Sequence, residues 1–187
     1  DTAAKGLPEI DVWQSEFISQ CECPACEEKG QFCAETEAII NAWRQVQKEY
    51  PDFKLRIFFS LVDNQKKTYD CLMNLPVDVK AGWVYGPRKP FDELAAKGYW
   101  VASWAIQAGA PYDFLGVKQG VKDLHDKRWS GAYGYSANKY GMAALAETSW
   151  NINGRDEKEF AVAWALKKGY ANPEGVAEWI MLIGPVK

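Results

Sequence analysis

The chain has 187 residues, of which 48% are hydrophobic, enough for a globular domain with a substantial buried core. Its 22 Lys and Arg residues against 25 Asp and Glu residues give a net charge of -3, with no basic block long enough to follow a phosphate backbone. We therefore expect no nucleic-acid partner. No apolar run approaches the ~20 residues that a membrane span needs, so we expect no membrane partner either.

Strand and helix patterns alternate along the first two thirds of the chain. In chain order, the apolar positions predict a strand at 10–14, a helix at 32–50, a strand at 54–60, a helix at 64–73, a strand at 77–85, a helix at 91–97, a strand at 99–106, a helix at 112–126 and a strand at 129–135. The run at 54–60 is apolar enough for a strand covered on both faces. Each strand except the last is followed by a crossover segment, which predicts parallel neighbours.

The remainder of the chain is predicted to be helical. Residues 140–149 form one helical stretch, and residues 156–168 form another after a break at 151–154. Asp156 with Glu159 is a capping box, and Gly169 suits the position after the helix end. We therefore expect two regions. Residues 1–136 form part of a (β/α) barrel that includes a Cys-rich loop at 15–33, and residues 137–187 form a helical segment that packs on the barrel.

The barrel interpretation rests on what the strand–helix repeat lacks. Such a repeat builds either a doubly wound sheet or a (β/α)8 barrel, and the sequence has neither a GxGxxG nor a GxxxxGK[ST] phosphate-binding turn. We therefore expect an α/β fold with a parallel sheet of TIM-barrel type. Five strands are too few for a whole barrel of ~250 residues, so the chain is either the C-terminal part of a larger barrel or closes in another way. The unpaired edges of such an arc predict association with the missing N-terminal half of the barrel or with another copy.

Four cysteines, Cys21, Cys23, Cys26 and Cys33, lie within thirteen residues just after the first predicted strand. Four thiolates at this spacing are able to enclose one tetrahedral ion, so we expect a structural zinc. An iron–sulfur cluster accepts the same ligands, and two disulfides are the alternative in an oxidising compartment. Cys71 stands alone on a predicted helix and is expected to be a small buried apolar side chain.

Glu16 follows the first predicted strand directly, at the end where barrel enzymes carry their active sites. Trp13 and Phe17 flank it, and a carboxyl group in such surroundings is suited to protonate a glycosidic oxygen. The alternative is a solvated loop glutamate. Nine tryptophans also suggest flat platforms on which sugar rings stack, although each of them has a packing alternative. The candidate substrate-binding residues at strand ends are Trp13, Tyr85, Trp104, Gln107, Tyr133 and Tyr135.

The run at 10–16 followed by Cys21-Glu22-Cys23-Pro24-Ala25-Cys26 resembles the strand-four region of bacterial barrels related to family 20 glycoside hydrolases. These include the uncharacterised family named domain of unknown function 4838. The stretch 140–168, with Ser149-Trp150-Asn151, is similar to the helical tail of such barrels. The resemblance implies strands four to eight of the barrel, with Glu16 in the general acid's place. Ser15 stands where family 20 enzymes have an Asp that orients the substrate acetamido group.

These observations together predict a carbohydrate-active protein, a glycoside hydrolase with Glu16 as its acid. One alternative is a glycan-binding barrel without catalysis, and another is a metal or redox protein built on the Cys cluster. The first residues, Asp-Thr-Ala-Ala-Lys, lack the charged and apolar regions of a signal peptide, so we expect none within the given sequence. A secreted or periplasmic location is expected if the parent protein resembles the family.

Overall fold

The computed structural model describes residues 2–16, 22–60, 62–104, 112–134 and 138–184. The chain divides into two compact units, each described by itself below. The first unit is Asp1–Ser103 with Lys127–Ser130, and the second is Trp104–Asp126 with Gly131–Lys187. The boundary expected after residue 136 falls within the second unit.

The fold is α/β, with one five-stranded sheet in the order β1-β2-β3-β4-β5. Its strands are β1 (Glu9–Trp13), β2 (Lys54–Phe59), β3 (Val79–Trp83), β4 (Val101–Ser103) and β5 (Gly131–Ala132). The pairings of β1 with β2, β2 with β3 and β3 with β4 are parallel, as the sequence predicts. A doubly wound sheet reverses its strand order at a switch point. The sequential order seen here is instead consistent with part of an α/β barrel.

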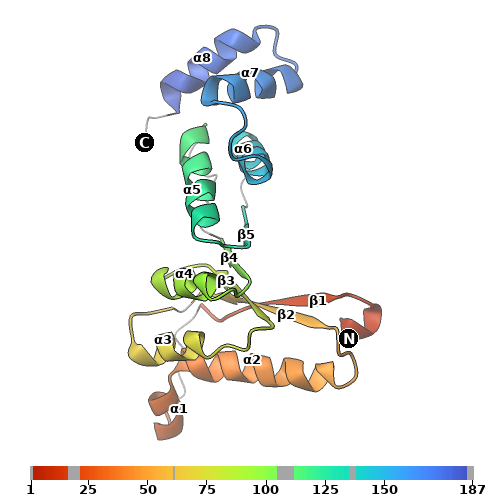
Figure 1. Ribbon diagram of the computed structural model, residues 1–187, viewed down its shortest axis with the longest axis vertical. Helices are drawn as coiled ribbons and strands as arrows, with labels where there is room; N and C mark the ends of the chain where they lie inside the picture. The colour runs from red at the N-terminus through yellow and green to blue at the C-terminus, as the bar shows by residue number, and fades with distance from the viewer. Residues whose placement is uncertain (1, 17–21, 61, 105–111, 135–137, 185–187) are drawn as a thin grey trace. The chain divides into compact units, whose positions relative to one another are not determined.

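The helices of the first unit follow the strands in alternation (Figure 1). Helices α1 (Pro24–Lys29) and α2 (Gln31–Gln47) follow β1, α3 (Lys66–Met73) follows β2 and α4 (Lys89–Ala96) follows β3. A 3-10 turn (Ala3–Lys5) precedes β1. The sequence predicts α2, α3 and α4 but not α1, which lies inside the expected Cys-rich loop. Its start is explained by Pro24, because proline suits the first turn of a helix.

The core of the first unit joins β2 to helices α2 and α4. Leu55, Ile57 and Phe59 alternate along β2 and are almost fully buried. The Phe59 ring lies 5.5 Å from that of Phe32 on α2 and 5.9 Å from that of Phe91 on α4. One face of the sheet is therefore held by apolar packing on helices.

The opposite face of the sheet carries charge. Arg56 on β2 pairs with Glu9 and with Asp11 on β1, the latter at 3.1 Å, and Lys80 on β3 also pairs with Glu9. The Arg56 guanidinium lies 4.8 Å from the centre of the Trp100 ring. Phe58 lies on the same face as Arg56 and is buried under Trp13, and the Arg56 side chain is only 15% exposed. Both faces of β2 are therefore covered, as expected, but the second face is covered by charged and aromatic side chains together.

The second unit is mainly helical. Its helices are α5 (Phe114–Asp126), α6 (Lys139–Trp150), α7 (Glu157–Lys167) and α8 (Pro173–Ile183). The Phe114 ring stacks on Phe160 of α7 at 4.6 Å, and Tyr140 of α6 meets the edge of the same ring at 5.1 Å. The predicted capping box is confirmed, because Asp156 and Glu159 bond each other's backbone N–H groups. Helix α8 was not predicted as a separate element.

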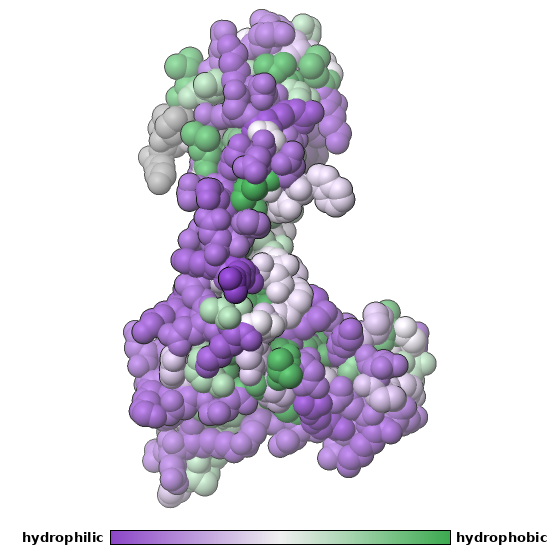
Figure 2. All heavy atoms as spheres, viewed as in Figure 1, coloured by the Kyte–Doolittle hydropathy of each residue, from purple (hydrophilic) through white to green (hydrophobic). Residues whose placement is uncertain are grey.

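Several apolar side chains of the second unit face solvent. Leu182 on α8 is 77% exposed and Leu166 on α7 is 60% exposed. Figure 2 shows hydrophobic residues among the polar ones over these two helices. Within the described residues, no helix is long and apolar enough to cross a membrane.

Candidate functional site

Trp13 and Glu16 form a pair at the carboxyl end of β1. The Trp13 indole Nε1 donates a hydrogen bond of 2.8 Å to Glu16 Oε1. The same indole stacks on Phe58 of β2, with ring centres 5.3 Å apart and planes 25° apart. Trp13 nevertheless stays 40% exposed, and Glu16 is exposed too. The pair therefore presents part of a flat aromatic ring to solvent beside an oriented carboxylate.

Gln14, the residue after Trp13, fixes the strand end from inside. Its side chain is fully buried and its Nε2 donates to the Phe32 carbonyl and to Thr36 Oγ1, both at 3.2 Å on α2. Ser60, just after β2, donates from Oγ to the Gln14 carbonyl at 2.7 Å. Three elements thus meet at Gln14. Because a buried polar group is costly without partners, these bonds give the strand end a defined position.

Glu35 on α2 is a carboxylate at this strand end that the sequence reasoning missed. Its Oε1 accepts the backbone N–H of Ser15 at 2.8 Å, and Ser15 is the neighbour of Glu16. Glu35 lies on the same helix face as the buried residues Phe32 and Thr36. No local feature of the sequence singles out Glu35, because its contact depends on how α2 packs beside β1.

Tyr85 is the remaining predicted site residue of the first unit, and it too follows a strand end. Tyr85 comes two residues after β3 and is 52% exposed. Because the strands of this unit are parallel, Tyr85 and Glu16 both lie at the carboxyl edge of the sheet, as expected.

Two further candidates lie in the second unit. Trp104 follows β4 directly and Tyr133 follows β5 directly, and their ring centres are 5.8 Å apart. They therefore form an aromatic pair beside the ends of two neighbouring strands. The candidates Gln107 and Tyr135 lie outside the described residues.

The Cys cluster is only partly described, because Cys21 lies outside the described residues. Cys23 is the cap residue of α1, Cys26 lies on α1 and Cys33 on α2, and all three are thiols. Among the described residues, no group of three or more His, Cys, Asp or Glu side chains is arranged to hold a metal ion. A zinc held by Cys21, Cys23, Cys26 and Cys33 stays a prediction.

Cys71 is not the isolated apolar side chain that the sequence suggests. It is half-buried on α3, and its thiol has the thiol of Cys33 on α2 as a neighbour. Burial and, next, the neighbouring Cys33 raise the pKa of the Cys71 thiol to about 12. Cys71 is therefore protonated at neutral pH.

A hollow of about 350 Å³ lies where β2 ends and α2 and α3 begin. Ser60, Val62 and Asp63 line it from the strand end. The residues that line it from the helices and the turns before them are Lys29, Gly30, Gln31, Phe32, Cys33, Gln65, Lys67 and Thr68. Parallel α/β sheets bind ligands at the carboxyl ends of their strands. The hollow lies at that end of β2, where Ser60 lines it.

A second hollow of about 820 Å³ lies between α6 and α7 of the second unit. Its rim carries Trp150, which is 93% exposed, and an ion pair of 2.7 Å between Arg155 Nη1 and Glu147 Oε2. Glu147 lies on a helix, as the sequence predicts. The second unit therefore has an exposed indole of its own, which serves below as a comparison for Trp13.

Comparisons of the chain with known protein families, with characterised proteins and with solved structures find no match. The resemblance to family 20 barrels therefore stays a prediction, and any function has to be argued from the side chains themselves.

Proposed function

We propose that this chain is the C-terminal part of a (β/α) barrel that acts on carbohydrate, with its sugar site at the carboxyl end of β1. The observation that carries the proposal is the Trp13–Glu16 pair, in which an exposed indole orients a carboxylate beside it. The sequential order of parallel strands supports the barrel, because barrels place their sites at this end of the strands.

In the catalytic form of the proposal, Glu16 donates its proton to the glycosidic oxygen as the bond to the anomeric carbon breaks, and water supplies the incoming oxygen. Such hydrolysis needs a second carboxylate to activate the water or to attack the sugar. Glu35 is the described candidate, because it bonds the backbone of the residue next to Glu16.

Glycan binding without hydrolysis is the second candidate. Its support is the exposure of Glu16, since a carboxylate in water that already accepts an indole N–H is suited to accept hydrogen bonds from sugar hydroxyls. In this form Trp13 supplies the stacking face and Glu16 orients the sugar.

Replacing Trp13 by alanine is expected to weaken glycan binding by roughly tenfold or more, because the stacking face is lost and Glu16 loses its donor. A glycan array would identify a ligand, and calorimetry would then measure its affinity for each variant. Trp150→Ala is the matched control, because it removes an even more exposed indole from the second unit. Binding that survives Trp13→Ala but disappears with Trp150→Ala would contradict the placement of the site.

Replacing Glu16 by glutamine separates the two candidates. If Glu16 is the acid, hydrolysis of aryl glycosides should fall ~10²–10⁴-fold while binding persists. We expect the rate of the chain alone to be low, because a barrel site draws residues from the ends of several strands. The assay should therefore also be run on the parent protein if it is longer. Hydrolysis that Glu16→Gln leaves unchanged would refute Glu16 as the acid, and binding without hydrolysis would favour the second candidate.

A further inference from the structure

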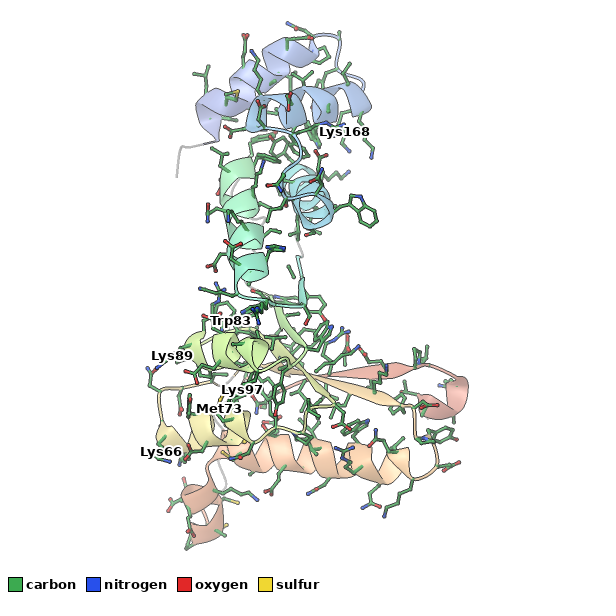
Figure 3. All side chains as sticks on the ribbon, in the orientation of Figure 1. Lys66, Met73, Trp83, Lys89, Lys97 and Lys168 are labelled. Atoms are coloured by element: carbon green, nitrogen blue, oxygen red, sulfur yellow. The ribbon has the colours of Figure 1, made fainter. Side chains whose placement is uncertain are left out.

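Cys33 and Cys71 form a thiol pair between two helices, far apart in sequence. Cys33 is the third residue of α2, and Cys71 lies on α3 between Lys66 and Met73, which Figure 3 labels. Cys33 Sγ lies 3.4 Å from the carbonyl oxygen of Lys67, one helical turn before Cys71. The Thr36 side chain, also on α2, is a second neighbour of the Cys71 thiol. Two side chains of α2 therefore lie beside Cys71.

The two thiols differ in their access to reagents. Cys33 lines the hollow of about 350 Å³, through which a small disulfide can reach its thiol. Cys71 does not line that hollow. This is the division of roles between a cysteine that reacts first and one that resolves the product.

We propose that Cys33 and Cys71 form a reversible disulfide that ties α2 to α3 when the protein meets a disulfide oxidant such as oxidised glutathione. The Cys33 thiolate attacks one glutathione sulfur, which forms a mixed disulfide and releases one glutathione thiolate. Cys71 then gives its proton to that thiolate as its sulfur attacks Cys33, which breaks the mixed bond and releases the second glutathione. Two electrons leave the protein, and one oxidised glutathione becomes two reduced molecules.

The bond would act on the candidate site through α2. Phe32 and Thr36 hold the Gln14 side chain, and Glu35 holds the backbone of Ser15, all within one turn of Cys33. A disulfide that closes a loop of about 40 residues restricts the unfolded chain and fixes this first part of α2 against α3. The oxidised form is therefore the more stable one, and its candidate site is held more tightly.

Tryptic mapping tests the proposal directly, because trypsin separates the cysteines into three peptides. Residues 30–44 contain only Cys33, residues 68–80 contain only Cys71, and residues 6–29 contain the other three. The full chain is oxidised with glutathione disulfide, alkylated while denatured, and digested without reductant. We expect peptides 30–44 and 68–80 as one linked species that dithiothreitol separates, together with a rise in melting temperature of roughly 10 °C.

Two variants control the experiment. Cys33→Ser should abolish both the linked species and the temperature rise, whereas Cys26→Ser should leave both in place. Full alkylation of Cys33 and Cys71 after oxidation would overturn the proposal, as would a link from peptide 30–44 to peptide 6–29. A stoichiometric zinc in the reduced protein that shields Cys33 from alkylation, and that Cys33→Ser releases, would replace the disulfide with the metal site.

Discussion

Replacing Gly86 by alanine is expected to destabilise the first unit by about 3 kcal/mol or more, whereas the same change at Gly98 costs about 1–2 kcal/mol. Both glycines have positive φ, +91° and +88°, so both replacements force alanine into a strained backbone. The difference lies in the surroundings. A Cβ at Gly86 would lie 2.1 Å from the carbonyl oxygen of Val62, but at Gly98 nothing lies within 4 Å.

Urea unfolding of the two variants and of the unchanged protein separates the cost of the backbone angle from the cost of the contact with Val62. Gly98→Ala gives the cost of the backbone angle, and the excess at Gly86 gives the cost of moving the Val62 backbone. Because Val62 lines the hollow at the end of β2, Gly86→Ala should also alter that hollow. Equal losses at the two positions would show that the contact with Val62 does not matter.

The strand pattern was predictable because each strand of the first unit is short, apolar on at least one face and followed by its own crossover. Apolar spacing located β2 to within one residue, at Lys54–Phe59. What it could not show was the second face of that strand. Arg56 is paired with Glu9 and Asp11, and those partners come from β1, some 45 residues earlier in the chain. A pairing of that kind depends on sheet register, which local composition does not encode.

The candidate site also combines residues whose positions the local sequence predicts with residues whose contacts depend on packing between elements. The position of Glu16 at the carboxyl end of β1 was predictable, because strand ends are local features. Glu35 and Cys71 were not, since their roles depend on how α2 packs against β1 and α3. The spacing of Cys21, Cys23 and Cys26 predicted a metal-binding loop, whereas the chain forms a short helix from Pro24. Contacts between elements thus decide which polar residues gather.

Replacing Phe59 by alanine is expected to cost about 3–5 kcal/mol of the free energy of unfolding. Phe59 is fully buried, and its ring lies between Phe32 of α2 and Phe91 of α4. The variant would leave a cavity where the sheet meets both helices, and neither helix can close it without leaving its other contacts. Tyr85→Ala is the control, because it removes an aromatic ring that is 52% exposed and should cost less than about 1 kcal/mol. Chemical denaturation followed by circular dichroism would measure both changes. If Phe59→Ala lost no more stability than Tyr85→Ala, β2 would not be the centre of the core. The packing of Phe59 on α2 would then not explain how that helix is held beside Gln14 and Ser15.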